Sequence, residues 1–170
     1  ATIHSFNLKV FDPTWFELSS AALIAKLDAQ QRIRRSPKLR LACAAYIEFL
    51  RLGGRIFFEP LSGELIRRHL NRGVPLIAGL SSSYLYQAPR EHGPEDTPDD
   101  LRGNPTGHFV VLCGYDRKAR SVEIADPLES NPHSPTQHYA IDINRVLSSI
   151  MLGVLTYDAN LIALEPPAKP

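Results

Sequence analysis

Hydrophobic positions in the first half of the chain recur with the spacing of helices. The apolar positions are Leu18, Leu23, Ile24 and Leu27 in one stretch, and Leu39, Ala42, Cys43, Tyr46, Ile47 and Leu50 in the next. Each set falls on one helical face, so we predict a first helix to about Gln30 and a second from Ser36 to Gly53. Serine caps a helix and glycine ends one, and the same signals predict a third helix from Ser62 to about Asn71.

The second half reads mainly as strands joined by loops. Apolar runs of strand length cover Val74 to Leu80, His108 to Tyr115 and Arg120 to Ala125, with one or two closing strands within Gly153 to Leu164. The remaining elements are strands at Thr2 to Val10 and Arg55 to Glu59, a helix near Ile143 to Met151 and an unstructured tail at Pro166-Pro167. A helical first half followed by a mostly antiparallel sheet indicates an α+β fold.

Residues 84–107 form the longest stretch without hydrophobic periodicity. The segment contains four prolines, three glycines and a cluster of acids from Glu95 to Asp100. A structureless stretch of this length inside a compact domain is usually functional or disordered. Because it ends next to His108, we predict that it can act as a lid over that residue.

Composition narrows the classes of function. A length of 170 residues fits one domain, and a net charge of +1 gives no general drive toward nucleic acid or an anionic membrane. The basic run from Arg32 to Arg40 is typical of a solvated helix start. No stretch has the length of a transmembrane helix, and Cys43 and Cys113 are too few for a disulfide framework. We therefore expect a cytoplasmic protein with reduced thiols, no nucleic-acid partner and no membrane insertion.

Two neighbouring strands bring a histidine and a carboxylate together. With Asp116 opposite Arg120 across the turn, position 110 lies opposite Asp126. His108 is then the diagonal neighbour of Asp126 on the same face. Their strands are apolar on both faces, so we expect a sheet largely buried on both faces, with this polar pair at the strand ends beside a cleft. A histidine held by an acceptor can act as a general base, whereas the alternative is a structural histidine that only caps a strand.

The motifs around this pair resemble the bacterial double-glycine leader peptidases of the papain-like superfamily. The matching runs are Gly107-His108-Phe109-Val110-Val111-Leu112, Gly114-Tyr115-Asp116 and Ile124-Ala125-Asp126-Pro127. Residues 7–8, 11–16 and 153–158 are similar to a bacterial subgroup of leader-peptidase-like proteins of unassigned substrate. The resemblance implies a papain-like cysteine-peptidase fold over residues 1–170, with His108 as the base and Asp126 as its orienting carboxylate. It also implies a peptide or protein substrate.

The nucleophile of such an enzyme is missing from the sequence. Papain-like enzymes place a cysteine upstream, at a helix N-terminus that favours the thiolate, and this family carries a glutamine just before it. No Gln–Cys–Gly block precedes His108. Cys43 falls mid-helix on an apolar face, and Cys113 points to the opposite face of the strand from His108 unless a bulge intervenes. Turn formation explains the serines at 81–83 better than catalysis does.

Metal and cofactor chemistry find little support in the sequence. His92, His108, His133 and His138 lack the compact spacing of a metal site, and no phosphate loop or dinucleotide fingerprint is present. We therefore expect neither a metal nor another cofactor.

Two hypotheses follow for residues 1–170, which we expect to be a single leader-peptidase-like domain without its N-terminal nucleophile segment. In the first, a cysteine segment upstream of Ala1, or another chain, supplies the thiol, and the enzyme hydrolyses a peptide or isopeptide bond through a thioester. In the second, the domain has lost its nucleophile and binds a peptide in the old cleft. An oriented His108–Asp126 pair favours the first, because a binding cleft needs no base. The chain alone should be inactive.

Overall fold

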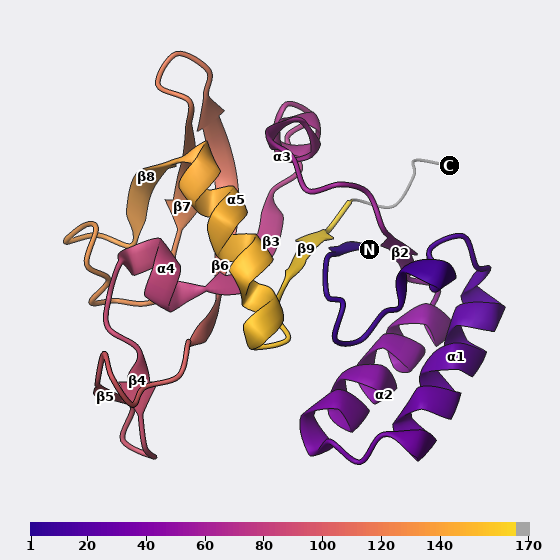
Figure 1. Cartoon of the computed structure of the whole chain (residues 1–170). Helices are drawn as coiled ribbons and strands as arrows, with labels where there is room; N and C mark the ends of the chain where they lie inside the picture. The colour runs from indigo at the N-terminus through magenta and orange to yellow at the C-terminus, as the bar shows by residue number, and fades with distance from the viewer. Residues whose placement is uncertain (166–170) are drawn as a thin grey trace.

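Seven strands form one sheet across both halves of the chain in the computed structural model, which describes residues 1–165 (Figure 1). The strand order is β2-β1-β9-β3-β6-β7-β8. The bounds are β1 Thr2–Ser5, β2 Arg55–Phe57, β3 Leu76–Ser81, β6 Gly107–Asp116, β7 Ser121–Ala125, β8 His138–Asp142 and β9 Asn160–Ala163. Only the β1–β2 pair is parallel among these, and the other neighbours are antiparallel. The predicted tail at Pro166-Pro167 lies outside the described residues.

Two helices, α1 (Ser20–Ile33) and α2 (Pro37–Arg51), pack side by side next to the β1–β2 edge of the sheet (Figure 1). The Ser36 hydroxyl accepts a hydrogen bond from the Leu39 backbone N–H, so the predicted start of the second helix is confirmed. The two helices bury a separate core cluster, made of Ile3, Val10, Phe11, Leu23, Leu27, Leu39, Cys43, Tyr46, Ile47 and Leu50. They therefore stabilise the end of the sheet that lies away from the candidate site.

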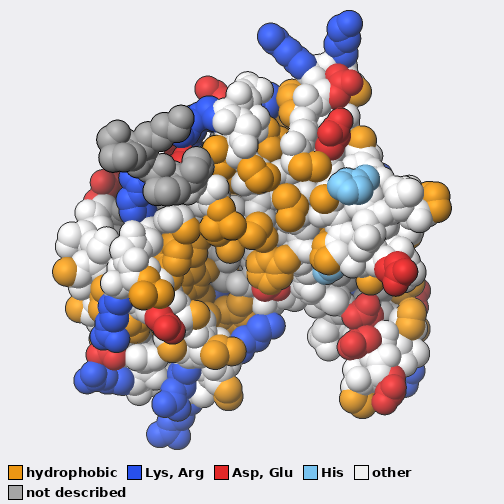
Figure 2. All heavy atoms as spheres, turned by 180° about the vertical axis from the view of Figure 1, so that it is seen from behind, with side chains coloured by type: hydrophobic (Ala, Val, Ile, Leu, Met, Phe, Trp, Pro, Cys, Tyr) orange, Lys and Arg blue, Asp and Glu red, His pale blue; other side chains and the backbone are white. Residues whose placement is uncertain are grey.

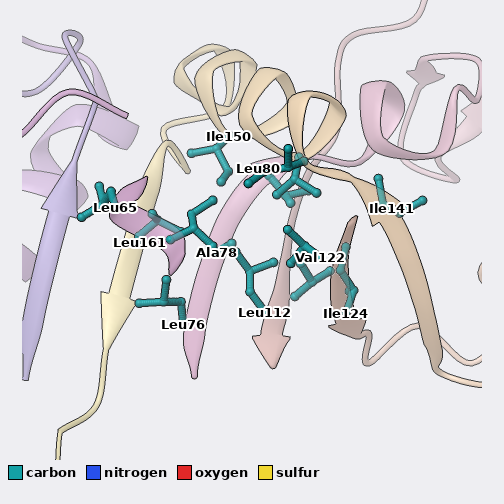
Figure 3. Close-up of a cluster of buried hydrophobic side chains, with 14 of the residues drawn as sticks. Leu65, Leu76, Ala78, Leu80, Leu112, Val122, Ile124, Ile141, Ile150 and Leu161 are labelled. Atoms are coloured by element: carbon teal, nitrogen blue, oxygen red, sulfur yellow. The ribbon is translucent and has the colours of Figure 1, made fainter. Parts of the chain in front are cut away.

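Three further helices cover one face of the sheet. They are α3 (Gly63–Leu70), capped by Ser62 as predicted, the short α4 (Ser82–Tyr86) and α5 (Ile143–Leu152). Asp142 caps α5 by accepting hydrogen bonds from the backbone N–H groups of Asn144 and Arg145. Beneath these helices lies the main core, in which Leu76, Leu80, Val110, Leu112, Ile124 and Ile150 interdigitate (Figure 3).

The opposite face of the sheet is covered by α1 and α2 at its β1–β9 end, where Ile3 is buried in their cluster and Ile162 packs against it, and it is open over β6 and β7 in residues 1–165. Phe109 is 45% exposed there, while Val110, the next residue on the same strand, is buried beneath the helices. Ile77, Val111 and Ala125 line a groove of about 440 Å³ on the open face, and Figure 2 shows hydrophobic side chains gathered in a hollow between two lobes. We expected burial on both faces, because the strands are apolar on both. Among the described residues one face is covered along most of the sheet, and the other only at its β1–β9 end.

The α+β class is confirmed, with the helical pair early in the chain and a mostly antiparallel sheet after it. Several short elements escaped prediction. These are α4, β8, the small hairpin of β4 (Glu91–His92) with β5 (Thr97–Pro98), and the 3-10 turn Gly153–Leu155. Within residues 1–165, no helix has both the length and the apolar content needed to cross a bilayer.

Candidate active site

His108 and Asp126 contact each other at the ends of adjacent strands. His108 Nε2 donates a hydrogen bond to Asp126 Oδ1 over 2.9 Å. The Asp126 side chain is fully buried, whereas 22% of the His108 side chain is exposed. One end of the pair is therefore shielded from water while the imidazole remains accessible.

A bulge places the two residues in register. Asp116 pairs with Ser121, one residue beyond the predicted Arg120. The pairing shifts by one between Leu112 and Gly114, and the last pair of the ladder is Val111 with Ala125. The predicted turn pairing is thus wrong by one residue. The bulge at position 113 compensates for it, and the register beside the site is the predicted one.

Asp126 receives three hydrogen bonds in addition to the one from His108. Oδ2 accepts from the hydroxyls of Tyr86, at 2.7 Å, and Tyr139, at 2.5 Å, and Oδ1 also accepts from the Leu128 backbone N–H at 2.9 Å. Burial by itself raises the pKa of Asp126, but the hydrogen bonds from His108, Tyr139 and Tyr86 outweigh it and hold the pKa below its usual value. Asp126 is therefore a carboxylate at neutral pH despite its burial.

This carboxylate determines which nitrogen of His108 can react. A carboxylate can only accept, so Nε2 carries a proton, and in the neutral imidazole the lone pair is on Nδ1. His108 lines a cleft of about 230 Å³ together with Tyr86, Glu91 and Thr106. Glu91 lies in the predicted lid and accepts a hydrogen bond from the Thr106 hydroxyl at 2.7 Å. The site thus presents an oriented imidazole to a cleft with one wall from the lid segment.

A second hollow adjoins the cleft on the other side of Gly107. It has a volume of about 380 Å³, and Lys38, Glu91 and Asp158 are among the side chains that line it. The Asp158 side chain packs directly against Gly107, where a Cβ atom would collide with its carboxylate. Tyr157, which precedes Asp158, has a φ of 75°, a strained conformation for a bulky residue.

Comparison with known proteins bears on what this cleft does. The model of the Peptidase_C39 like family matches residues 61–146, which is half of the chain and includes both His108 and Asp126. The chain belongs to this family.

One solved structure is similar to part of this C39-like chain. It comes from Bacillus anthracis and is described provisionally as a C39-like peptidase. The two share 18% sequence identity with a TM-score of 0.36, over 62% of this chain and 48% of the other. The chain therefore spans about half the length of the structure that it matches. A search of curated proteins found no match.

The two cysteines of this C39-like chain lie away from the His108 imidazole. Cys43 is buried in the core between α1 and α2, where Gln30 Nε2 donates to its sulfur over 3.4 Å and burial raises the pKa of its thiol. Cys113 sits at the bulge on the open side of β6, and its thiol contacts the Glu123 carbonyl oxygen at 3.4 Å. Burial also raises the pKa of the Cys113 thiol, and the negative charge of Glu123 raises it further by a smaller amount. Neither thiol has the activated setting of a catalytic nucleophile.

The serines at positions 81–83 end β3 and begin α4, and two of them line the cleft. Ser82 donates to the Thr106 carbonyl oxygen at 3.2 Å, and the Ser83 hydroxyl accepts from the Thr106 N–H at 3.1 Å. Both hydroxyls hold the lid segment against α4. This structural use agrees with the preference for a turn over a nucleophile.

The other histidines do not form a metal site with His108. Within residues 1–165, no group of three or more His, Cys, Asp or Glu side chains is arranged to hold a metal ion. His133 Nε2 donates to the Leu85 carbonyl oxygen at 3.0 Å, and its ring packs 5.8 Å from Tyr86 and 5.1 Å from Tyr139, measured between centroids. His133 is thus part of the wall behind the carboxylate.

Sequence reasoning missed the two tyrosines that contact Asp126. Tyr86 ends α4 and Tyr139 lies on β8, and neither element was predicted. For Tyr139 a signal exists, because Tyr139 and Ile141 alternate with more polar residues just before the helix cap at Asp142. For Tyr86 we find no local signal, since its role depends on contacts 40 residues away along the chain.

Proposed function

We propose that this chain carries the general base and its orienting carboxylate for a cysteine peptidase, and that the thiol comes from a segment outside residues 1–170. The observation that carries the proposal is the His108–Asp126 pair, whose buried carboxylate leaves His108 Nδ1 free beside a cleft. The arrangement matches the requirements of a base, namely a fixed tautomer, an ionised partner and access for a substrate.

The proposed reaction is hydrolysis of a peptide or isopeptide bond. His108 Nδ1 takes the thiol proton, and the thiolate attacks the carbonyl carbon. Collapse of the tetrahedral intermediate breaks the C–N bond as the imidazolium gives its proton to the leaving amine. The imidazole then takes a proton from water, and the resulting hydroxide cleaves the thioester and regenerates the thiol. Asp126 stabilises the imidazolium formed in each half of the cycle.

The open face of the sheet supports a contribution from a further segment. Antiparallel sheets that face water on one side normally carry polar residues there. Here that face presents Ile77, Phe109 and Val111. Gly107, the residue before the proposed base, begins β6, the strand that carries Phe109 and Val111. We therefore propose that the nucleophile-bearing segment packs on this face.

The proposal also covers the source, the compartment, the domain organisation and the partners of the enzyme. The motifs of the sequence support a bacterial, cytoplasmic peptidase related to the double-glycine leader peptidases, built as a single domain over residues 1–170 with its nucleophile segment added. Its partners would be a peptide or protein substrate and the segment, or the second chain, that supplies the thiol.

A thiol-reactive peptide probe on the native full-length gene product tests the proposal. We expect the probe to label one cysteine that is neither Cys43 nor Cys113, as located by mass spectrometry. Labelling should be lost in His108→Ala and kept in Lys118→Ala, a change at an exposed side chain in the turn between β6 and β7. Absence of labelling, or labelling that persists in His108→Ala, would overturn the proposal in favour of a nucleophile-free peptide-binding domain.

A further inference from the structure

The Asp126 carboxylate has a complete set of hydrogen-bond donors. His108 Nε2 and the Leu128 N–H bind Oδ1, and the hydroxyls of Tyr86 and Tyr139 bind Oδ2. A carboxylate offers about four lone-pair sites, so this side chain has little capacity left for water. The donors come from α4, β6, β8 and the loop after β7, so the carboxylate joins four segments of the fold.

The two tyrosine hydroxyls remain donors over the working pH range. Burial, and then the hydrogen bond to Asp126, raise the pKa of both Tyr86 and Tyr139. Their rings are held from behind by His133, whose ring lies against both. The hydroxyls therefore stay protonated, and their direction is fixed by the packing of the rings.

We propose that Tyr86 and Tyr139 are positioning residues that keep Asp126 ionised and turn its Oδ1 toward His108, and thereby keep the imidazole proton on Nε2. The proposal rests on the function proposed above, because orientation of the base matters only if His108 Nδ1 accepts a proton. Two donors on Oδ2 oppose rotation of the carboxylate, since any rotation breaks both bonds. They also disperse its negative charge, so that Asp126 accepts a hydrogen bond from His108 without taking its proton.

A simpler role for the hydroxyls would be to fill a polar gap in the core. That role predicts a loss of stability when a hydroxyl is removed but no change in the protonation of the pair. Tyr46 provides the matched control, because its hydroxyl makes one comparable buried hydrogen bond, 2.9 Å to Asn160 Oδ1, in the other core cluster. Tyr46→Phe removes the same atom without touching Asp126.

The test uses the full-length protein with labelled histidine and aspartate, studied by NMR over a pH series. In wild type we expect His108 as the Nε2–H tautomer. Tyr86→Phe and Tyr139→Phe should each move the titration midpoint of Asp126 upward by about one pH unit, a tenfold change in its proton affinity. The double variant should move it further and populate the other tautomer of His108. Tyr46→Phe should change neither signal.

Unchanged Asp126 and His108 titrations in the two single variants would overturn the proposal, and these variants decide the question if the double variant does not fold. The NMR signals need no substrate and no nucleophile. Shifted titrations in a protein that fails the peptide-probe test would therefore support the positioning role while contradicting the peptidase. Normal probe labelling with unshifted titrations would support the peptidase and contradict the positioning role.

Discussion

Asp126 reaches His108, with 2.9 Å between Oδ1 and Nε2, because the bulge at position 113 restores a register that the turn had shifted. Without that extra residue every side chain of β7 beyond the bulge would move to the other face of the sheet. Asp126 would then point to the open face, away from His108. The geometry of the His108–Asp126 pair thus depends on a local irregularity in β6. This irregularity lies three residues beyond Val110, which pairs with Ala78 in the main core.

Loss of the Asp126 carboxylate should destabilise the protein strongly. Asp126→Ala leaves His108 Nε2 and two tyrosine hydroxyls without their acceptor in a buried setting. We expect a loss of about 3 kcal/mol in the free energy of unfolding, measured by urea denaturation. Glu129→Ala, an exposed change in the following loop, serves as the control. A loss below about 1 kcal/mol would mean that the network is not formed in solution.

Two glycines beside the site should respond differently to the same substitution. A Cβ at Gly79 would collide with the backbone oxygen of Asp158, whereas a Cβ at Gly107 would collide with the Asp158 side chain. Gly79→Ala should therefore cost about 3 kcal/mol whether or not position 158 is changed. Gly107→Ala should cost about 2 kcal/mol in the wild-type background and much less in Asp158→Ala. Equal rescue of both glycine variants by Asp158→Ala would contradict this packing.

Acid should weaken the protein through a histidine pair outside the site. His4 and His69 are buried, with their Nε2 atoms 3.2 Å apart. Burial lowers the pKa of both below the ordinary value of 6.5, although Glu59 opposes this at His4. The unfolded chain therefore binds more protons than the folded one below pH 6.5, and stability is lost as the pH falls from there.

Urea unfolding at pH 7.5 and 5.5 measures this effect. We expect wild type to lose about 1 kcal/mol more over this interval than His69→Gln, which keeps only one of the two histidines. The charged neighbours Glu59, Arg68, Arg72 and Glu165 remain in both proteins. An exposed control, His138→Gln, should behave as wild type. Identical slopes for wild type and His69→Gln would show that the pair does not carry the pH dependence.

Adjacent residues on β6 test whether the open face is covered in the full-length protein. Val110 is buried in the main core, and Phe109 lies on the open face. If another segment packs there, Phe109→Ala should cost about 3 kcal/mol in the full-length protein, at least as much as Val110→Ala. A cost for Phe109→Ala within about 0.5 kcal/mol of zero would indicate that the face contacts water.

The sequence was informative where function depends on neighbours along the chain. The caps at Ser36 and Ser62 were predicted because a capping hydroxyl acts on an N–H three residues later. The pairing of His108 with Asp126 was predicted because one hairpin holds both. The bulge was not predicted, although Gly114, an isolated glycine within the strand beside Cys113, is typical of one.

Contacts between distant segments could not be predicted. Tyr86 and Tyr139 meet at Asp126 only after α4 and β8 have packed beside it. The strand pattern predicted an apolar second face, and the residues there are apolar as expected. Alternation shows which face a residue occupies but not what covers it, and so the open face appeared only in the structure.

The pH dependence of thiol alkylation in the full-length protein tests the central claim most directly. If His108 activates a cysteine outside residues 1–170, iodoacetamide should react with that cysteine well below pH 8.5, where an ordinary thiol is protonated. In His108→Ala the reaction should follow a simple thiol titration near pH 8.5, while Lys118→Ala, an exposed change away from the cleft, should resemble wild type. Superimposable profiles for wild type and His108→Ala would contradict the account.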